Sequence, residues 1–268
     1  MKAHLVQTDI AWEDRAENHR RVEAMLEAHA GLAPGDLVVL PEMFDTGFSF
    51  VLERTADRDG ATLAWIQQKA RRFGVTLHGA RTVIGPDGRG RNRVTVADPA
   101  GAVICEYDKV HPFSFGRESE FFSGGDEVKA YRWRGGGSAS APGAAEECIV
   151  CPAICYDLRF PELFRRGMLM GAEVFALGAN WPAPRALHRS VLSQARAIEN
   201  QAYMLCVNRA GSDPHLTYSG GTMAFGPRGE ALGALGDGPG ILTVDIDLAD
   251  ARAWREMFPA CRDIKLMK

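Results

Sequence analysis

The chain of 268 residues lacks several features that would assign it to a common protein class at once. Its apolar runs are far shorter than the roughly 20 residues that a membrane-spanning helix needs. No positively charged segment followed by an apolar stretch stands at its N-terminus. No basic stripe interrupts the mixed charges, whose net value is -3. These absences argue against a membrane and against nucleic acid as partners, and we expect a soluble cytoplasmic protein.

Cysteine is scarce, and its placement excludes a disulfide-stapled secreted scaffold. Of six cysteines, Cys105, Cys148, Cys151 and Cys206 lie inside apolar, strand-like runs, as is usual in a reducing compartment. Cys151 and Cys155 are spaced CxxxC, but no second pair of cysteines or histidines completes a zinc pattern. A zinc-binding protein that uses these two residues is an alternative that metal analysis would test. We expect neither a metal nor a cofactor.

The chain also lacks the glycine-rich turn that a doubly wound nucleotide-binding fold requires after its first strand, since residues 8–12 contain no glycine. Near-continuous apolar runs at 36–40 and 148–154 suit strands that are buried on both faces. The Gly-Pro-Asp-Gly segment at 85–88 predicts a hairpin. The sequence therefore predicts one α/β domain over residues 1–268, with two mixed sheets packed together and helices outside.

The expected elements alternate along the chain. Apolar periodicity predicts strands at 3–7, 36–40, 75–83, 93–98, 101–107, 148–154, 173–177, 203–208, 222–225 and 241–246. It predicts helices at 18–30, 62–73, 160–170, 186–201 and 250–257. The segment 135–147, rich in Gly, Ala and Ser, indicates a flexible hairpin loop rather than a domain boundary.

Cys155 is the first candidate functional residue. It ends the apolar run 148–154, and the helical pattern that follows has Pro161 in a position suited to a first turn. A thiol at a strand-to-helix turn points out of the sheet, and a nearby helix N-terminus favours the thiolate. The alternative interpretation is an inert buried cysteine, which is how most free cysteines occur.

Two other strand ends carry ionisable residues. Glu42 closes the strand at 36–40, and Lys109 follows the strand at 101–107. Because sites in open α/β sheets form beyond the carboxyl ends of strands, a carboxylate, an ammonium and a thiol converge if these strands are neighbours. Taken singly, Glu42 is equally explained as a turn cap and Lys109 as a solvated surface charge.

The sequences around these residues resemble the nitrilase, or carbon–nitrogen hydrolase, superfamily. The resemblance runs from Leu5 to the closing helix and includes the family's order of glutamate, lysine and cysteine. The matching segments are Leu40-Pro41-Glu42-Met43-Phe44, Tyr107-Asp108-Lys109-Val110-His111, Ile154-Cys155-Tyr156-Asp157-Leu158-Arg159, Ala179-Asn180-Trp181-Pro182, Ala195-Arg196-Ala197-Ile198-Glu199-Asn200 and Val207-Asn208-Arg209.

This resemblance implies a fold and a chemistry. The fold would be an α-β-β-α sandwich of two mixed six-stranded-type sheets flanked by helices, and its subunits would pair as a homodimer. Glu42 would be the general base, and Cys155 would attack the carbonyl carbon of an amide. Lys109 and the backbone N–H of Tyr156 would stabilise the oxyanion. After ammonia leaves, Glu42 would activate the water that hydrolyses the thioester.

Many members of the superfamily have a second active-site glutamate between the lysine and the cysteine. The segment 115–120 offers two candidates, Glu118 and Glu120. Glu118 matches the spacing of the branch with a short interval after the lysine, and we expect it to take this role. Both glutamates are otherwise explained as ordinary loop charges.

The segments 42–49 and 180–185 look most like the omega-amidase-type branch, which hydrolyses the terminal amide of small 2-oxo dicarboxylate monoamides such as 2-oxoglutaramate. Phe44, Tyr156 and Trp181 would then wall the pocket. Arg117 or Arg185 could bind the substrate carboxylate, but the interpretation that we favour for both is a solvated surface arginine. Core or dimer-interface packing is the alternative for Phe44 and Trp181. Another amidase, a carbamoylase, a nitrilase and a catalytically idle binding protein are the alternative functions.

Overall fold

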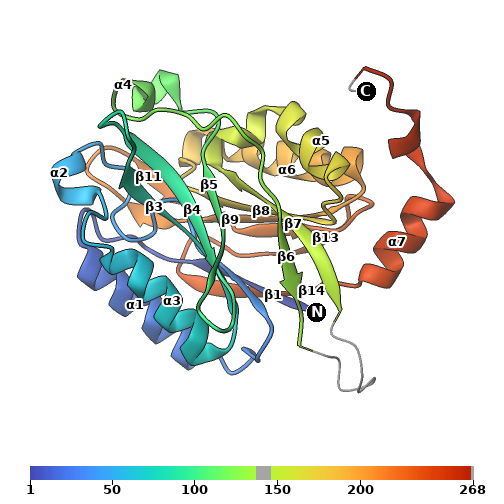
Figure 1. Ribbon diagram of the computed structural model, residues 1–268, viewed down its shortest axis with the longest axis horizontal. Helices are drawn as coiled ribbons and strands as arrows, with labels where there is room; N and C mark the ends of the chain where they lie inside the picture. Colours follow the sequence, from blue (N-terminus) through green and yellow to red (C-terminus); the bar gives the residue numbers. More distant parts are fainter. Residues whose placement is uncertain (137–145, 267–268) are drawn as a thin grey trace.

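Two six-stranded sheets packed face to face, with helices on their outer sides, form the molecule (Figure 1). The computed structural model describes residues 1–136 and 146–266. This arrangement confirms the expected α-β-β-α sandwich of two mixed sheets. The central part of the expected loop at 135–147 lies outside the described residues.

The first sheet has the order β14-β1-β2-β3-β4-β5. Its central strands β1, β2 and β3 are parallel, whereas β4, β5 and β14 join antiparallel at the two sides. The strands are β1 (Lys2–Gln7), β2 (Leu37–Val39), β3 (Thr76–Ile84), β4 (Gly90–Ala97), β5 (Val103–Asp108) and β14 (Gly240–Asp245). The predicted hairpin at 85–88 is the β3–β4 connection, so this expectation is confirmed.

The second sheet has the order β13-β12-β9-β8-β7-β6, with β7, β8 and β9 parallel. Its strands are β6 (Tyr131–Arg134), β7 (Glu147–Ile154), β8 (Val174–Ala179), β9 (Tyr203–Asn208), β12 (Met223–Phe225) and β13 (Ala231–Ala234). A separate two-stranded ribbon pairs β10 (Ala210–Ser212) with β11 (Thr217–Ser219). The parallel central strands are buried along their whole length in β8 and β9, as their unbroken apolar sequences require.

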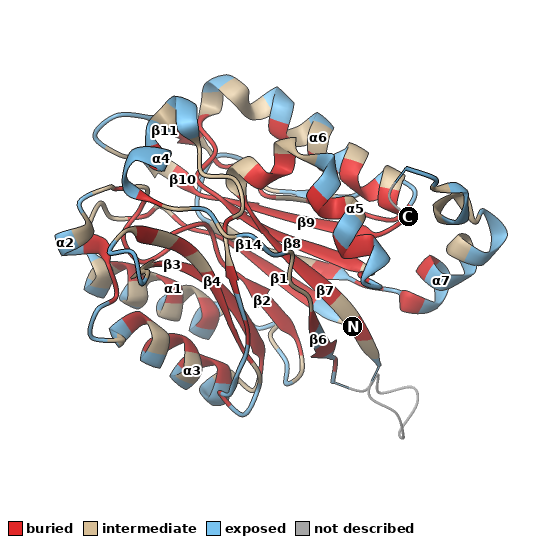
Figure 2. Cartoon of the chain, turned by 45° about the horizontal axis from the view of Figure 1, so that its top comes forward, coloured by how far each residue is buried: buried red, intermediate tan, exposed pale blue. Residues whose placement is uncertain are grey.

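Helices cover both outer faces of the sandwich, as Figure 2 shows by their red inward and blue outward sides. The helices α1 (Arg15–Ala28) and α3 (Ala61–Phe73) lie on the first sheet, and α5 (Pro161–Leu169) and α6 (Ala186–Asn200) lie on the second. The remaining helices are α2 (Leu52–Thr55), α4 (Glu118–Phe121) and α7 (Leu248–Met257). No helix in residues 1–136 and 146–266 is long and apolar enough to cross a bilayer.

The elements that sequence patterns missed are all short. β6 pairs with β7 alone and alternates buried Tyr131 and Trp133 with exposed arginines, while β10, β11 and β13 span three or four residues. So few residues carry too little periodicity to be recognised, and these strands depend on their partners for pairing. The long helices and central strands match their predicted positions within a few residues.

Candidate active site

Three strand ends from two different sheets meet in one place. Glu42 follows β2, Lys109 follows β5, and Cys155 follows β7. The sheets approach closely there because Gly178 of β8 has no side chain: a Cβ atom at this position would lie 2.6 Å from the carbonyl oxygen of Leu40. The convergence that the strand-end argument predicted is therefore present, with a glycine making room for it.

The Glu42 carboxylate is completely buried and accepts hydrogen bonds at both of its oxygens. Its Oε1 accepts from Lys109 Nζ at 2.8 Å and from Asn92 Nδ2 at 2.8 Å. Its Oε2 accepts from the backbone N–H of Asn180 at 2.9 Å. The side chain of Asn180 also donates to the carbonyl oxygen of Glu42 at 2.8 Å. These contacts hold the carboxylate in one orientation, which a general base requires.

Lys109 lies between two buried carboxylates. Its Nζ donates to Glu42 Oε1 and to Glu118 Oε2, each at 2.8 Å. Burial acts to lower the pKa of Lys109, but the negative charges of Glu118 and Glu42 outweigh it and raise the pKa above its usual value. The ammonium therefore stays protonated at physiological pH and keeps a fixed positive charge beside the reaction site.

Of the two candidate second glutamates, the structure brings Glu118 to the site. Its side chain is buried and accepts hydrogen bonds from Lys109, from Asn92 Nδ2 at 3.1 Å and from the backbone N–H of Phe113 at 2.6 Å. Burial raises the pKa of Glu118, and the Lys109 charge opposes this rise. Glu120 is exposed and forms an ion pair with Arg117 instead.

Cys155 has a left-handed backbone conformation, with φ of 44°, at the start of the 3-10 turn Cys155–Arg159. A residue with a Cβ atom adopts this conformation at a cost of about 1–2 kcal/mol, so the surrounding contacts must hold it. Buried Asp157 supplies several of them, since it accepts hydrogen bonds from the N–H of Ile154 at 2.9 Å and from Tyr107 Oη at 2.6 Å. This sharp turn presents the half-buried thiol to the pocket.

The environment of Cys155 favours the thiol, which differs from the thiolate that we expected. Burial and the nearby Glu42 carboxylate raise the pKa of Cys155, and the positive charge of Lys109 only partly opposes them. The expected helix N-terminus does not help, because the 3-10 turn intervenes and α5 begins only at Pro161. The thiol is therefore protonated in the resting protein and needs a base before it can attack.

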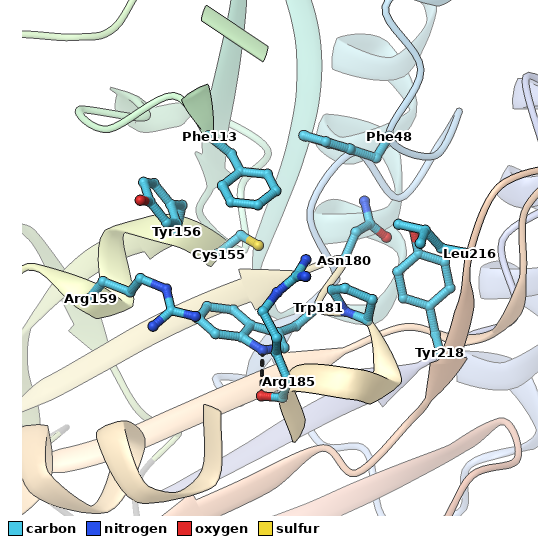
Figure 3. A pocket seen from close by; sticks show the side chains of 11 residues that line it. Phe48, Phe113, Cys155, Tyr156, Arg159, Asn180, Trp181, Arg185, Leu216 and Tyr218 are labelled. Atoms are coloured by element: carbon cyan, nitrogen blue, oxygen red, sulfur yellow. Dashed lines mark hydrogen bonds between the residues drawn. The ribbon is translucent and has the colours of Figure 1, made fainter. Parts of the chain in front are cut away.

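A narrow pocket opens in front of the sulfur, with a cavity volume of about 40 Å³ (Figure 3). A cavity of this size suits a small acyl group. Its walls are aromatic and cationic: Phe48, Phe113, Tyr156, Arg159, Asn180, Trp181, Pro182, Arg185, Leu216 and Tyr218.

Two arginines line this pocket without a carboxylate partner in the described part of the chain. Arg159 packs over the Trp181 ring at 5.1 Å and contacts His188 Nδ1 at 3.1 Å. Arg185 packs over the Phe113 ring at 5.4 Å. Neither guanidinium is paired with an acidic side chain among residues 1–136 and 146–266, so both positive charges are available to an anionic ligand.

Two of the three predicted wall residues line the pocket, and one does not. Tyr156 and Trp181 lie where we expected them. The expectation for Phe44 is wrong, because its ring is fully buried beneath α1 and α3, 5.4 Å from the Trp65 ring. Phe48, on the loop that follows, takes the place in the wall. The turn between β2 and this loop decides which ring faces the pocket.

Of the two arginines predicted to bind the substrate carboxylate, one lines the pocket and one does not. Arg185 lines the pocket, whereas the side chain of Arg117 is 70% exposed and paired with Glu120. Arg159 was missed, although it lies within the segment that carries the family resemblance. Asn92 was missed too, and a signal for it existed: it occupies a buried position of β4 on the same face as Val94. A polar residue on an apolar strand face is informative.

The arrangement contains what acyl transfer through a thioester requires: a thiol, a carboxylate beside it and a permanently charged ammonium. Within the described residues, no group of three or more His, Cys, Asp or Glu side chains is placed to hold a metal ion.

Comparison with known proteins agrees with this arrangement. A family model described as carbon–nitrogen hydrolase matches residues 2–256. The 2-oxoglutaramate amidase of Bacillus subtilis is 32% identical over 262 residues, which cover 97% of this chain and 96% of that protein. Omega-amidase YafV of Escherichia coli is 34% identical over 266 residues, or 98% of this chain and 96% of the other.

Solved structures show the same likeness. A CN-hydrolase superfamily protein of Xanthomonas campestris, crystallised with an arsenic adduct in its active site, has 33% sequence identity to this chain. It matches with a TM-score of 0.89 over 100% of this chain and 98% of its own.

Proposed function

The chain belongs to the carbon–nitrogen hydrolase family, and on that basis we propose that it hydrolyses the terminal amide of a small, carboxylate-bearing substrate and releases ammonia. The substrate class is the 2-oxo dicarboxylate monoamides, of which 2-oxoglutaramate is the example. Relatives named for this activity cover nearly the whole chain at 32% and 34% identity.

Proton transfer begins the reaction. Since the pKa of Cys155 is raised, the thiol must lose its proton as it attacks, and Glu42 is the base that receives it. The C–S bond forms at the substrate carbonyl, and the C–N bond then breaks as Glu42 returns the proton to the departing nitrogen. Water, deprotonated by the same carboxylate, then hydrolyses the thioester to a carboxylate and restores the thiol.

The charge that develops on the carbonyl oxygen is stabilised by Lys109. Its ammonium is already fixed by Glu42 and Glu118, so little reorganisation is needed when the oxyanion forms. The backbone N–H of Tyr156, directly after the nucleophile, is the second donor. Glu118 keeps the ammonium aimed at the reaction site.

The observation that carries the substrate class is the pair of arginines in the pocket. Arg159 and Arg185 line the same small cavity as Cys155 and lack acidic partners among the described residues. A free carboxylate at the far end of the substrate would bind these guanidiniums while the amide lies at the sulfur. Hydrogen bonds to charged groups contribute about 1.5–3 kcal/mol each, which is enough to favour a carboxylate-bearing amide over a neutral one.

A panel assay for ammonia release tests this proposal. It compares 2-oxoglutaramate, 2-oxosuccinamate, glutamine, asparagine and simple nitriles under one set of conditions. The two 2-oxo monoamides should give the highest kcat/KM. A higher value for a nitrile or for a neutral amide would contradict the proposed substrate class. If none of these compounds releases ammonia, the result would favour the alternative that the protein is a catalytically idle binding protein.

We also propose that the protein is a homodimer, which pairs through α6. Leu187, Val191 and Ile198 lie on one side of this helix and are 73%, 55% and 51% exposed. An exposed apolar stripe on an otherwise amphipathic helix is typical of an interface. Sedimentation should give twice the chain mass, and Val191→Asp should shift the protein to the monomer. A monomer before mutation would contradict this assignment.

A cytoplasmic location remains part of the proposal. All six cysteines are free, which suits a reducing compartment. Cell fractionation that follows the amidase activity would test it.

A further inference from the structure

A second hollow adjoins the catalytic pocket and shares four of its walls. Phe48, Phe113, Leu216 and Tyr218 line both spaces. The second hollow, here called the aromatic groove, continues past them to residues such as Trp12 and has a volume of about 530 Å³. It is much larger than the 40 Å³ pocket in front of the sulfur. Ammonia, the leaving group of the proposed reaction, is far smaller than this groove.

The groove offers apolar surfaces, because its acidic side chains are already paired. Glu13 accepts a hydrogen bond from Ser49 Oγ at 2.6 Å and forms an ion pair with Arg54 at 3.0 Å. Asp213 accepts a hydrogen bond from Tyr218 Oη at 2.5 Å and two more from backbone N–H groups. What remains for an occupant is mostly aromatic rings and aliphatic side chains, together with the His215 imidazole that packs against Trp12. Such surfaces suit an apolar or aromatic group.

The groove lies close to the charged groups of the catalytic site. Lys109 Nζ is 5.4 Å from the centre of the Phe48 ring, which is one of the shared walls. Burial and Asp213 raise the pKa of Tyr218, another shared wall, and the charge of Glu42 adds to this effect. Because Lys109 Nζ is also 2.8 Å from Glu42 Oε1, the base that protonates the leaving nitrogen is close to the groove.

The two arginines proposed to bind the acyl carboxylate distinguish the two spaces. Arg159 and Arg185 line the narrow pocket but not the aromatic groove. Figure 3 shows Phe48 and Leu216 across the Cys155 sulfur from Arg159, whereas Arg185 lies beside the sulfur and packs over Phe113, a shared wall, at 5.4 Å. A carboxylate bound by Arg159 therefore leaves the nitrogen of the amide directed at Phe48 and Leu216.

We propose that the aromatic groove is a leaving-group subsite and that the protein also cleaves N-substituted monoamides of dicarboxylates whose nitrogen bears an aromatic or apolar group. This activity rests on the proposed function, since it uses the same thiol, base and arginines. The groove receives the substituent on nitrogen while the arginines hold the acyl carboxylate.

The bond changes are those of amide hydrolysis with an amine in place of ammonia. Cys155 Sγ bonds to the carbonyl carbon as Glu42 takes the thiol proton. The C–N bond breaks, and the substituted nitrogen takes that proton and leaves as a primary amine. Water then adds to the thioester, so that the products are the dicarboxylate, the amine and the restored thiol.

The test compares succinamate, N-methylsuccinamate and N-benzylsuccinamate with the full chain. Methyl and benzyl amines are both alkylamine leaving groups, so the comparison reports mainly on contacts of the benzyl ring. We expect kcat/KM for the benzyl compound to exceed that for the methyl compound about tenfold or more, because burial of an aromatic ring contributes at least the 1.4 kcal/mol that a factor of ten requires.

A variant that fills the groove sharpens the test. Val51 lines the groove but not the catalytic pocket, and it is 40% exposed. Val51→Trp should remove the preference for the benzyl compound and leave succinamate hydrolysis unchanged. Val103 is also 40% exposed but lies on β5 outside the groove, so Val103→Trp is the matched control and should retain the preference.

The outcomes separate this inference from the proposed function. If succinamate is hydrolysed but the benzyl compound reacts no faster than the methyl compound, the subsite is overturned and the proposed function stands. Retention of the benzyl preference in Val51→Trp would also overturn it. If neither 2-oxoglutaramate nor any succinamate derivative reacts while a simple neutral amide does, the proposed substrate class fails, and the inference fails with it. The substrate comparison on the unchanged chain does not depend on how any variant folds.

Discussion

The floor and the wall of the catalytic pocket are built in opposite ways. The floor consists of Glu42, Asn92, Lys109 and Glu118, all at most 2% exposed and joined by hydrogen bonds of 2.8–3.1 Å. The outer part of the wall consists of Phe48, Phe113, Arg159, Arg185 and Leu216, which are partly or largely exposed and are held mainly by ring packing.

This difference indicates which residues of the site can be substituted without destabilising it. Removing one partner from the floor leaves a buried charge or polar group without its hydrogen bond, which costs several kcal/mol. Changing a residue of the outer wall leaves no buried charge without its partner, because these side chains contact mainly solvent and aromatic rings. We infer that the floor sets the reaction and that the wall sets the substrate.

The largest expected effect comes from removing the nucleophile above the floor. Cys155→Ala should reduce turnover to the uncatalysed rate without unfolding the protein, because only one sulfur atom is lost from a half-buried position. An assay of amide hydrolysis measures the loss of turnover, and a thermal melt shows whether the variant remains folded. Cys151→Ala is the control: Cys151 lies on β7 outside the pocket, and its loss should leave turnover intact. Turnover by Cys155→Ala would exclude a thioester mechanism.

The next effect tests the floor itself. Glu42→Gln should lower kcat about 100- to 10,000-fold, the usual contribution of a general base. It should also lower the pKa of Cys155, because the carboxylate that raises this pKa is gone while Lys109, which lowers it, remains. The midpoint of thiolate absorbance against pH should therefore move to lower pH than in the unmodified protein, with Cys155→Ala as the blank. Retained activity would contradict the assignment of the base.

A third comparison separates two neighbouring glutamates. Glu118→Gln should lower kcat about 100-fold, because loss of one of its two carboxylate anchors lets the Lys109 ammonium shift, and a small misplacement has an effect of that size. Glu120→Gln, two positions away and exposed, should have no effect on kcat. Equal effects of the two substitutions would show that Glu118 has no special position in the reaction.

The smallest effects are expected in the wall. Arg159→Gln and Arg185→Gln should each lower kcat/KM for a carboxylate-bearing amide about 10- to 100-fold, since one charged hydrogen bond contributes about 1.5–3 kcal/mol. Neither should affect a neutral short-chain amide. The control is Arg117→Gln, which removes an exposed arginine outside the pocket. A uniform loss on charged and neutral amides would indicate a structural effect and would remove the basis for carboxylate recognition.

The same contrast describes how far the sequence could predict the site. Glu42, Lys109 and Cys155 each follow an apolar strand, and the structure brings them together as the strand-end argument required. The wall was predicted only in part: Tyr156 and Trp181 line the pocket, but Phe44 lies in the core. Strand ends are indicated by periodicity, whereas the direction of a loop side chain depends on the turn that precedes it.

Sequence patterns alone determined the alternation of strands and helices, the mixed sheets and the positions of ionisable residues at strand ends, because apolar periodicity is a local property of the chain. The tertiary structure decided that Glu118 rather than Glu120 contacts Lys109, that Arg159 and Arg185 rather than Arg117 line the pocket, and that the environment of Cys155 favours the protonated thiol. These features arise from segments that are distant in sequence, and from the burial and charges that their packing creates.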